Sequence, residues 1–165
     1  MAAGESRSTD PLDYQDLPQA IGAMSKNFSD GFVIPLHEHE RDQLLYATRG
    51  IMRLQTDREA WIVPRDGAVY IPAGIQHSIS MHGAVEMRTL YIDAGKAKER
   101  AHALSVVAVS NLLRELILAL SEEPIRYDQD GRGGLIAQMI ELEIGRAREL
   151  SLNVPLPKDE RLQRL

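Results

Sequence analysis

The sequence predicts a mainly β protein, a small antiparallel barrel followed by two α-helices. Short β-type runs separated by turn residues fill residues 21–92, at the spacing of a sandwich or barrel. After Asp93 the apolar residues recur at nearly every fourth position, which is the period of a helix. A chain of 165 residues can bury one good core, so we expect a single domain with appendages.

Residues 1–18 contain too little apolar material to fold alone, and we expect a flexible arm there. We assign the barrel to residues 19–95. Its β-type runs are 32–34, 43–48, 51–55, 60–63, 69–71 and 87–92. Turn residues separate these runs, among them 29–31, 49–50, 64–67, 72–74 and 82–83, and Gly50 can take a positive φ.

Residues 96–152 are expected to be helical. The first apolar stripe runs from Leu104 through Leu112 and Leu116 to Leu120, and it predicts a helix that ends before Pro124. A second stripe over residues 135–150 predicts a second helix. Both stripes require burial, either within the subunit or against the same helices of another subunit. Residues 153–165 break the helix with two prolines and look like a junction to a further domain.

Composition excludes several classes of protein. The net charge is −5, from 19 basic and 24 acidic residues with interspersed signs, which argues against a nucleic-acid-binding surface on this chain. The absence of cysteine excludes disulfides and thiolate metal sites. We find neither a membrane-spanning apolar run nor a secretion signal, and we expect a cytoplasmic protein.

Four polar residues can meet inside the barrel: His37, His39, Gln43 and His77. Side chains two apart on a strand share a face, so His37 and His39 point the same way, and Gln43 keeps that parity if the strand resumes without a bulge. His77 shares parity with Ile79 on an apolar, inward face. Asp42 and Glu40 have the wrong parity to take the place of Gln43.

The chemistry of this cluster suits a divalent metal ion. Imidazole nitrogens and a carbonyl oxygen bind Zn²⁺, Ni²⁺, Fe²⁺ or Mn²⁺. The alternative is that the residues are an inherited polar lining, hydrogen-bonded among themselves or to an organic effector, because Gln43 supplies no charge.

The intervals resemble the cupin superfamily, whose fold is a double-stranded β-barrel, or jelly roll. Gly31, His37, His39, Gln43 and Gly50 are spaced as in the first cupin motif. The second motif is carried by Pro72, Gly74 and His77, preceded by Gly67 at four residues rather than the usual five. Cupin enzymes usually carry Glu where this chain has Gln43 and Asn where it has Met81, which weakens any transfer of enzyme chemistry.

The amino-acid sequence is more specifically similar to the N-terminal sensor domain of AraC/XylS-type transcriptional regulators. This similarity is found in residues 37–50, 61–64, 70–74 and 86–90. This resemblance implies an effector-sensing barrel, a helical dimerisation segment, and DNA contact only through a helix-turn-helix domain beyond residue 165. It favours a homodimer with a small-molecule effector and no catalysis. The residues expected at a dimer interface are Leu112, Leu116 and Leu120.

The competing interpretation is a stand-alone cupin metalloenzyme, a dioxygenase or isomerase with an open coordination position on the metal. The metalloenzyme interpretation would be favoured over the regulator if the reading frame stopped at Leu165. A storage module has no supporting feature. Candidate walls of an effector pocket are Tyr46, Trp61 and Tyr91, although aromatics are common in β-rich cores. His82 and His102 are interpreted as solvated surface residues.

Overall fold

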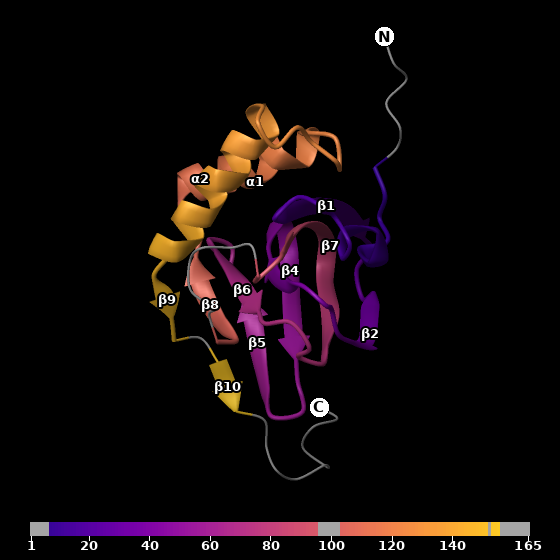
Figure 1. Cartoon of the computed structure of the whole chain (residues 1–165). Helices are drawn as coiled ribbons and strands as arrows, with labels where there is room; N and C mark the ends of the chain where they lie inside the picture. Colours follow the sequence, from indigo (N-terminus) through magenta and orange to yellow (C-terminus); the bar gives the residue numbers. More distant parts are fainter. Residues whose placement is uncertain (1–6, 96–102, 152, 156–165) are drawn as a thin grey trace.

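The computed structural model of the protein describes residues 7–95, 103–151 and 153–155. The chain forms a short 3-10 helix, η1, and then strands that curl around a common interior before two helices (Figure 1). The elements are η1 (Pro11–Tyr14), β1 (Ile21–Phe28), β2 (Val33–His37), β3 (Asp42–Leu45), β4 (Ala47–Gln55), β5 (Glu59–Val63), β6 (Gly67–Ile71), β7 (His77–Ile92), β8 (Ser105–Ala108), α1 (Asn111–Glu122), α2 (Arg132–Arg146), β9 (Glu149–Leu150) and β10 (Asn153–Pro155).

The long strand β7 organises the sheet. Within the described residues the sheet has ten strands in the order β10-β5-β4-β7-β3-β6-β8-β9, and β1 and β2 also pair with β7. All the pairings are antiparallel. The predicted mainly β fold with two helices after it is therefore confirmed.

Strand alternation divides the buried side chains between two cores. Along β7, Ile79, Met81 and Met87 face the barrel interior, whereas Leu90 and Ile92 face the helices. The same alternation places Val69 of β6 inside and Ala68 outside. The interior of the barrel and the layer under the helices are thus separate apolar clusters.

The helices α1 and α2 lie side by side over one side of the sheet (Figure 1). Helix α1 begins at Asn111 because Ser110 caps it, its hydroxyl accepting a hydrogen bond from the Leu113 amide at 3.0 Å. The loop before α2 packs closely, since a Cβ on Gly134 would lie 1.8 Å from the carbonyl oxygen of Gln129. The buried face of this hairpin covers the second apolar cluster.

The first helix starts later than the sequence predicts. Residues Ser105–Ala108, assigned to the helix, form strand β8, which pairs with β6 and β9. Val106 and Val107 point to opposite cores, which is strand alternation. The helix prediction was wrong here because adjacent valines also fit a helical stripe, and their β-branched side chains favour a strand.

Two predicted turns are irregularities inside long strands. Gly50 has φ +81° and lies within β4, where the register against β7 shifts. Gly83 has φ +76° and lies within β7. Gly50 takes the positive φ expected of it, but it bends one strand instead of joining two. A Cβ there would lie 2.5 Å from the carbonyl oxygen of Ala84.

Residues 7–18, which we expected to belong to a flexible arm, lie against the barrel. Tyr14 is 0% exposed and Leu17 4% exposed, and both belong to the interior cluster. The segment cannot form a core alone, but it contributes two large side chains to the core of the barrel. The rest of that arm, residues 1–6, lies outside the described residues.

The expected junction at residues 153–165 is described only in its first three residues. These form β10, which pairs with β5. Residues 156–165 lie outside the described residues, as does His102.

Candidate functional site

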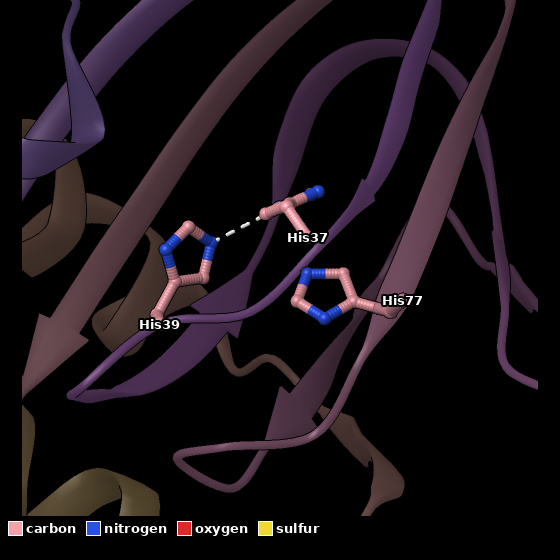
Figure 2. Close-up of side chains that lie close together, drawn as sticks. All are labelled: His37, His39 and His77. Carbon is pink, nitrogen blue, oxygen red and sulfur yellow. Dashed lines mark hydrogen bonds between the residues drawn. The ribbon is translucent and has the colours of Figure 1, made fainter.

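The structure brings His37, His39 and His77 together (Figure 2). His37 ends β2 and is the register partner of His77, which begins β7, while His39 lies in the loop after β2. Ring centroids are 4.7 Å apart for His37 and His39 and 4.3 Å apart for His37 and His77. One nitrogen from each ring lies within 4.8 Å of the other two.

Backbone carbonyl groups fix two of the three rings. His37 Nδ1 is 2.7 Å from the carbonyl oxygen of Pro35, and His77 Nδ1 is 2.8 Å from that of Ile75. A carbonyl oxygen only accepts, so each Nδ1 carries the proton, and each Nε2 carries a lone pair. This is the tautomer that an imidazole needs to bind a metal through Nε2.

His37 Nε2 lies 3.1 Å from His39 Nε2, and because the proton of His37 is on Nδ1, His39 Nε2 donates this hydrogen bond. A shared metal ion would take the place of that proton. His77 is 0% exposed, and its buried Nε2 has no hydrogen-bond partner among the described residues. Metal–nitrogen bonds of about 2.0–2.1 Å place two ligand atoms about 3.0–3.4 Å apart, so the His37–His39 separation fits a shared ion.

Burial favours the neutral form of His39 and of His77. Desolvation lowers the pKa of His77 to about 4; the carbonyl of Ile75 acts against this shift, and His37 adds to it. The pKa of His39 is also lowered to about 4, first by desolvation and then by His37 and His77. Neutral rings with free lone pairs can bind a metal at neutral pH without first losing a proton.

Gln43 is the fourth predicted residue, and it lines the same cavity. It is 2% exposed, and its Nε2 donates to Thr89 Oγ1 at 2.9 Å. Its Oε1 is buried without a hydrogen-bond partner among the described residues. Within the described residues, the site therefore contains two buried hydrogen-bond acceptors without a partner, Gln43 Oε1 and His77 Nε2, in addition to His37 and His39. Imidazole nitrogens and an amide oxygen together fit a divalent ion as ligands.

The cavity has a volume of about 360 Å³ and is mostly apolar. His37, His39 and Gln43 line its polar end. Its walls include Asp10 and Leu12 from the N-terminal segment. The apolar lining comes from Met24, Phe28, Phe32, Ile34, Ile79, Met87 and Tyr91.

The three aromatic residues proposed for an effector pocket lie in three different places. Tyr91 lines the cavity, with its ring 5.0 Å from that of His39. Tyr46 belongs instead to the cluster beneath the helices. Trp61 lines a separate cavity of about 660 Å³ together with Gln55 and Ser78.

The loops that carry the histidines are joined to each other and to the barrel. The amide of Gly74 donates to the carbonyl oxygen of His39 at 2.9 Å. Asp42 accepts from the Ala73 amide at 2.8 Å and from the Tyr70 hydroxyl at 2.5 Å. Asp42 therefore holds the turn before His77 and makes its bonds away from the histidines.

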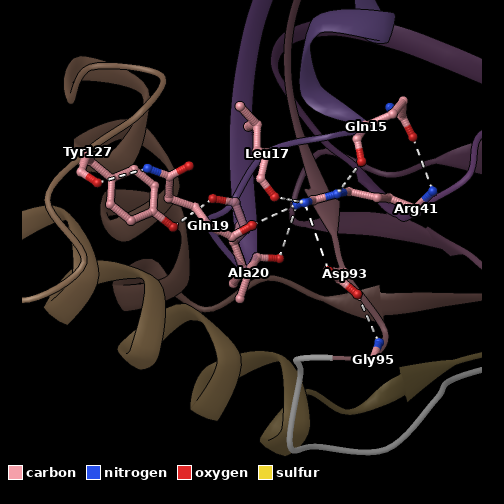
Figure 3. A network of polar contacts seen from close by, with 9 residues as sticks. Gln15, Leu17, Gln19, Ala20, Arg41, Asp93, Gly95 and Tyr127 are labelled. Atoms are coloured by element: carbon pink, nitrogen blue, oxygen red, sulfur yellow. Dashed lines mark hydrogen bonds and ion pairs between the residues drawn. The ribbon is translucent and has the colours of Figure 1, made fainter.

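Sequence reasoning missed Arg41, which joins the site to the N-terminal segment (Figure 3). Its guanidinium donates to the carbonyl oxygens of Gln15, Leu17 and Gln19 at 3.0, 2.5 and 2.9 Å. Arg41 is 5% exposed and lies 4.0 Å from Asp93. The position of Arg41 between His39 and a predicted strand could have suggested that it is buried, but nothing in the sequence indicates the carbonyl groups to which it donates.

The contacts continue from Gln19 to the helical hairpin. Gln19 Nε2 donates to the carbonyl oxygen of Tyr127 at 2.9 Å, and the Tyr127 hydroxyl donates to the carbonyl oxygen of Ile21 at 2.7 Å. Tyr127 lies in the loop between α1 and α2 (Figure 3). The N-terminal segment is thus hydrogen-bonded both to the histidine loop and to the helices.

The three leucines proposed for dimerisation differ in exposure. Leu112 is 48% exposed, Leu116 is half-buried, and Leu120 is 1% exposed. On α2, Leu135, Met139 and Leu142 are 63%, 40% and 50% exposed. Spaced three and four residues apart, these α2 side chains form one exposed apolar stripe.

The cupin domain family model matches residues 27–93. With the barrel and its histidine cluster, this match defines the region as a cupin domain. The chain is 25% identical over 135 residues to the HTH-type transcriptional regulator NimR of Escherichia coli (strain K12), a match that covers 82% of this chain. The chain spans 49% of the length of that curated relative.

The fold is also similar to that of part of ToxT from Vibrio cholerae. The apo K231A structure from strain SCE256 has a TM-score of 0.57 at 10% identity, covering 78% of this chain and 55% of that one. A ToxT structure from strain O395 bound to (E)-4-(8-methylnaphthalen-1-yl)but-3-enoic acid has a TM-score of 0.51 at 8% identity, with the same coverage. Both likenesses extend beyond the barrel into the helical region.

No helix in the described part of the chain is long and apolar enough to cross a membrane.

Proposed function

We propose that this chain is the effector-sensing and dimerisation part of an AraC-type transcriptional regulator. The observation that carries the proposal is an interior cavity of about 360 Å³ with a polar end made by His37, His39 and Gln43, in a cupin domain similar to a transcriptional regulator. DNA would be bound by a domain outside this chain, and the protein would act in the cytoplasm.

The polar end of the cavity would hold a divalent ion, Zn²⁺, Ni²⁺, Fe²⁺ or Mn²⁺, on His37, His39, Gln43 and His77. The bound ion would supply a positive charge and open coordination positions. The pair His37 and His39 is already at ligand–ligand distance, 3.1 Å, and binding would draw the remaining nitrogen in from up to 4.8 Å.

The apolar part of the cavity would receive the body of a small effector. ToxT has been crystallised with a carboxylic acid that carries a naphthalene ring, which supports a small organic molecule as the class of effector in this fold. Because the N-terminal residues Asp10 and Leu12 line the cavity, an effector would contact a segment that is hydrogen-bonded to the helical hairpin. A ligand that binds one arrangement of this segment better than another would shift the population toward it.

The hairpin would form the homodimer. Leu112 of α1 and the stripe Leu135, Met139 and Leu142 of α2 expose apolar area on the side away from the barrel. Exposed apolar stripes of this kind are typical of helix–helix contacts between subunits. Leu120 would support the interface from inside, because it packs in the cluster beneath the helices.

The experiment that tests the sensing site is metal analysis of the chain purified without a histidine tag, before and after chelation. We expect a single divalent ion per chain, taken up again by the chelated protein and not by the His37→Ala or His77→Ala variant. Absence of uptake by the wild-type chain refutes the metal site. A gel-shift assay of the whole gene product on its own upstream DNA tests the regulator, and lack of specific binding refutes it.

A cupin metalloenzyme, a dioxygenase or isomerase, is the second candidate, because two residues of the three-histidine group, His37 and His39, line a cavity. It is supported less well than the regulator, since Gln43 takes the place of a carboxylate. A general base would have to reach the cavity from Asp10 or Glu38, the carboxylates that line it.

A further inference from the structure

Thr89 lies behind Gln43, in the part of β7 that faces the barrel interior. It is 0% exposed. Its hydroxyl donates to the carbonyl oxygen of Leu44 at 3.1 Å and accepts from Gln43 Nε2 at 2.9 Å. Thr89 therefore contacts the side chain of one predicted metal ligand, but it does not line the cavity itself.

The hydroxyl of Thr89 decides which way the Gln43 amide faces. A hydroxyl has one hydrogen, and here it is given to a carbonyl oxygen, which can only accept. Only lone pairs are left for Gln43, so its NH₂ group must turn toward Thr89. The amide oxygen is then left on the side away from Thr89, buried without a partner among the described residues, in a residue that lines the cavity.

The same arrangement recurs around the cavity's polar end. The carbonyl of Pro35 takes the proton of His37 Nδ1, and the carbonyl of Ile75 takes that of His77 Nδ1. In the neutral rings each contact leaves a lone pair on Nε2, and the lone pair of His37 accepts a hydrogen bond from His39 Nε2 at 3.1 Å. His77 Nε2 and Gln43 Oε1 are buried acceptors without a partner among the described residues, and such a pair favours a cation.

We propose that Thr89 is the positioning residue that makes Gln43 an oxygen ligand, so that the polar end of the cavity is set for a divalent cation. This inference rests on the proposed metal site, and it names Thr89 as a residue on which the affinity of that site for the cation depends. It also explains a departure from the usual cupin pattern. The single proton of the Thr89 hydroxyl is given to the carbonyl oxygen of Leu44, so a glutamate at position 43 could accept from Thr89 only if that bond were broken. Glutamine instead donates its NH₂ group to the Thr89 hydroxyl.

The test is the affinity of the chelated chain for Ni²⁺ and Zn²⁺, measured by isothermal titration calorimetry. The variants are T89V, which keeps the shape of the side chain without the hydroxyl, and T89S, which keeps the hydroxyl. Loss of a residue that orients a metal ligand lowers affinity about 10- to 100-fold, which is the change we expect for T89V. T89S should bind within about 3-fold of the wild type, because its hydroxyl can make both contacts.

Two controls separate positioning from stability. Ser121→Ala deletes another buried hydroxyl, one that donates to the Ile117 carbonyl at 2.8 Å in α1, and it should leave cation affinity unchanged. The NMR signals of the Gln43 side-chain NH₂ should shift in T89V and not in T89S, with no metal present. Should T89V fail to fold, T89A takes its place in both measurements.

The outcomes are distinct. A wild-type chain that binds and a T89V chain that binds equally well overturn the role of Thr89 and leave the metal site intact. A wild-type chain that takes up neither cation overturns the metal site, and the role of Thr89 with it. Weak binding in T89V together with equally weak binding in T89S or Ser121→Ala also overturns the inference. The loss of cation affinity would then come from a general loss of stability and not from the orientation of Gln43.

Discussion

The carbonyl oxygen of His39 accepts a hydrogen bond from the amide of Gly74 at 2.9 Å. This bond joins the loop after β2 to the turn before β7, the two segments that bring His39 and His77 together. Gly74 has φ +77°, a conformation that places its amide toward the loop and that side chains rarely adopt. The separation between the histidines therefore depends on the backbone of Gly74.

Gly74→Ala should weaken cation binding by more than its effect on stability explains. A Cβ at position 74 meets nothing within 4 Å, so the cost is conformational strain, about 1 kcal/mol in the free energy of unfolding. Relief of this strain would shift the turn and move His39 relative to His77. Urea unfolding and titration with Ni²⁺ measure the two effects separately.

Gly83→Ala is the matched control. Gly83 has φ +76° and equally free space around a Cβ, but it lies within β7 away from the histidines. It should lose similar stability and keep its cation affinity. Equal affinity in the two variants would show that the bond between Gly74 and His39 does not set the geometry of the site.

Acid should destabilise the metal-free protein between about pH 6.5 and about pH 4. His39 and His77 each have a pKa near 4 in the folded chain and a usual value of 6.5. As pH falls through this window the unfolded chain takes up protons that the folded chain does not, so the free energy of unfolding decreases. For the buried His77 alone the loss is on the order of 3 kcal/mol. Above pH 6.5 neither group contributes a slope.

Urea unfolding at several pH values, with a chelator present, measures this slope. His77→Gln removes one of the two groups and should roughly halve the slope. A His77→Gln chain with the wild-type slope would mean that His77 has the same pKa in the folded and unfolded chain.

Part of the histidine cluster could be predicted because strand alternation is a local rule. His77 keeps the inward face that it shares by parity with Ile79, but His39 lies in the loop after β2, so its place beside His37 does not follow from strand alternation. The spacing alone does not give the ring tautomers. Those depend on the carbonyl groups of Pro35 and Ile75, whose positions follow from the loop conformation.

Other features depend on contacts between distant residues, which a single sequence does not reveal. Tyr46 and Tyr91 both lie among β-type residues, yet one faces the helices and the other the cavity. Tyr91 shares its face with its register partner Gln43, whereas Tyr46 shares the face of Leu44, and only the pairing of β3 with β7 decides which face is which. The partners of Arg41 are main-chain carbonyls of residues 15–20, which any sequence would supply.

Arg41→Met should release the N-terminal segment. It would leave the carbonyl oxygens of Gln15, Leu17 and Gln19 without their donor, at a cost of about 3–5 kcal/mol in the free energy of unfolding. The segment around Tyr14 should then be cut early by protease. Arg58→Met is the control, because Arg58 is 87% exposed and should be neutral. Unchanged proteolysis of residues 7–20 in Arg41→Met would argue against this role.

Self-association should depend on exposed leucines of the helices and not on exposed apolar residues of the barrel. Leu112 and Leu142 are 48% and 50% exposed on α1 and α2, and Ile62 is 46% exposed on β5. A glutamate at either helical position places a charge in the proposed interface, which costs its desolvation and should weaken a dimer by at least tenfold. The same change at Ile62 puts a charge on a strand face and should have no effect on assembly.

Sedimentation at micromolar concentration measures the distribution between monomer and dimer for the wild type and the three variants. We chose Leu112 in place of Leu116 or Leu120 because a charge at a buried position would damage the fold, and a monomer could then reflect unfolding. If the wild-type chain is monomeric at these concentrations, the helices do not hold two chains together. If the Ile62 variant alone dissociates, the subunits meet through the barrel, and the apolar stripe of α2 has some other partner.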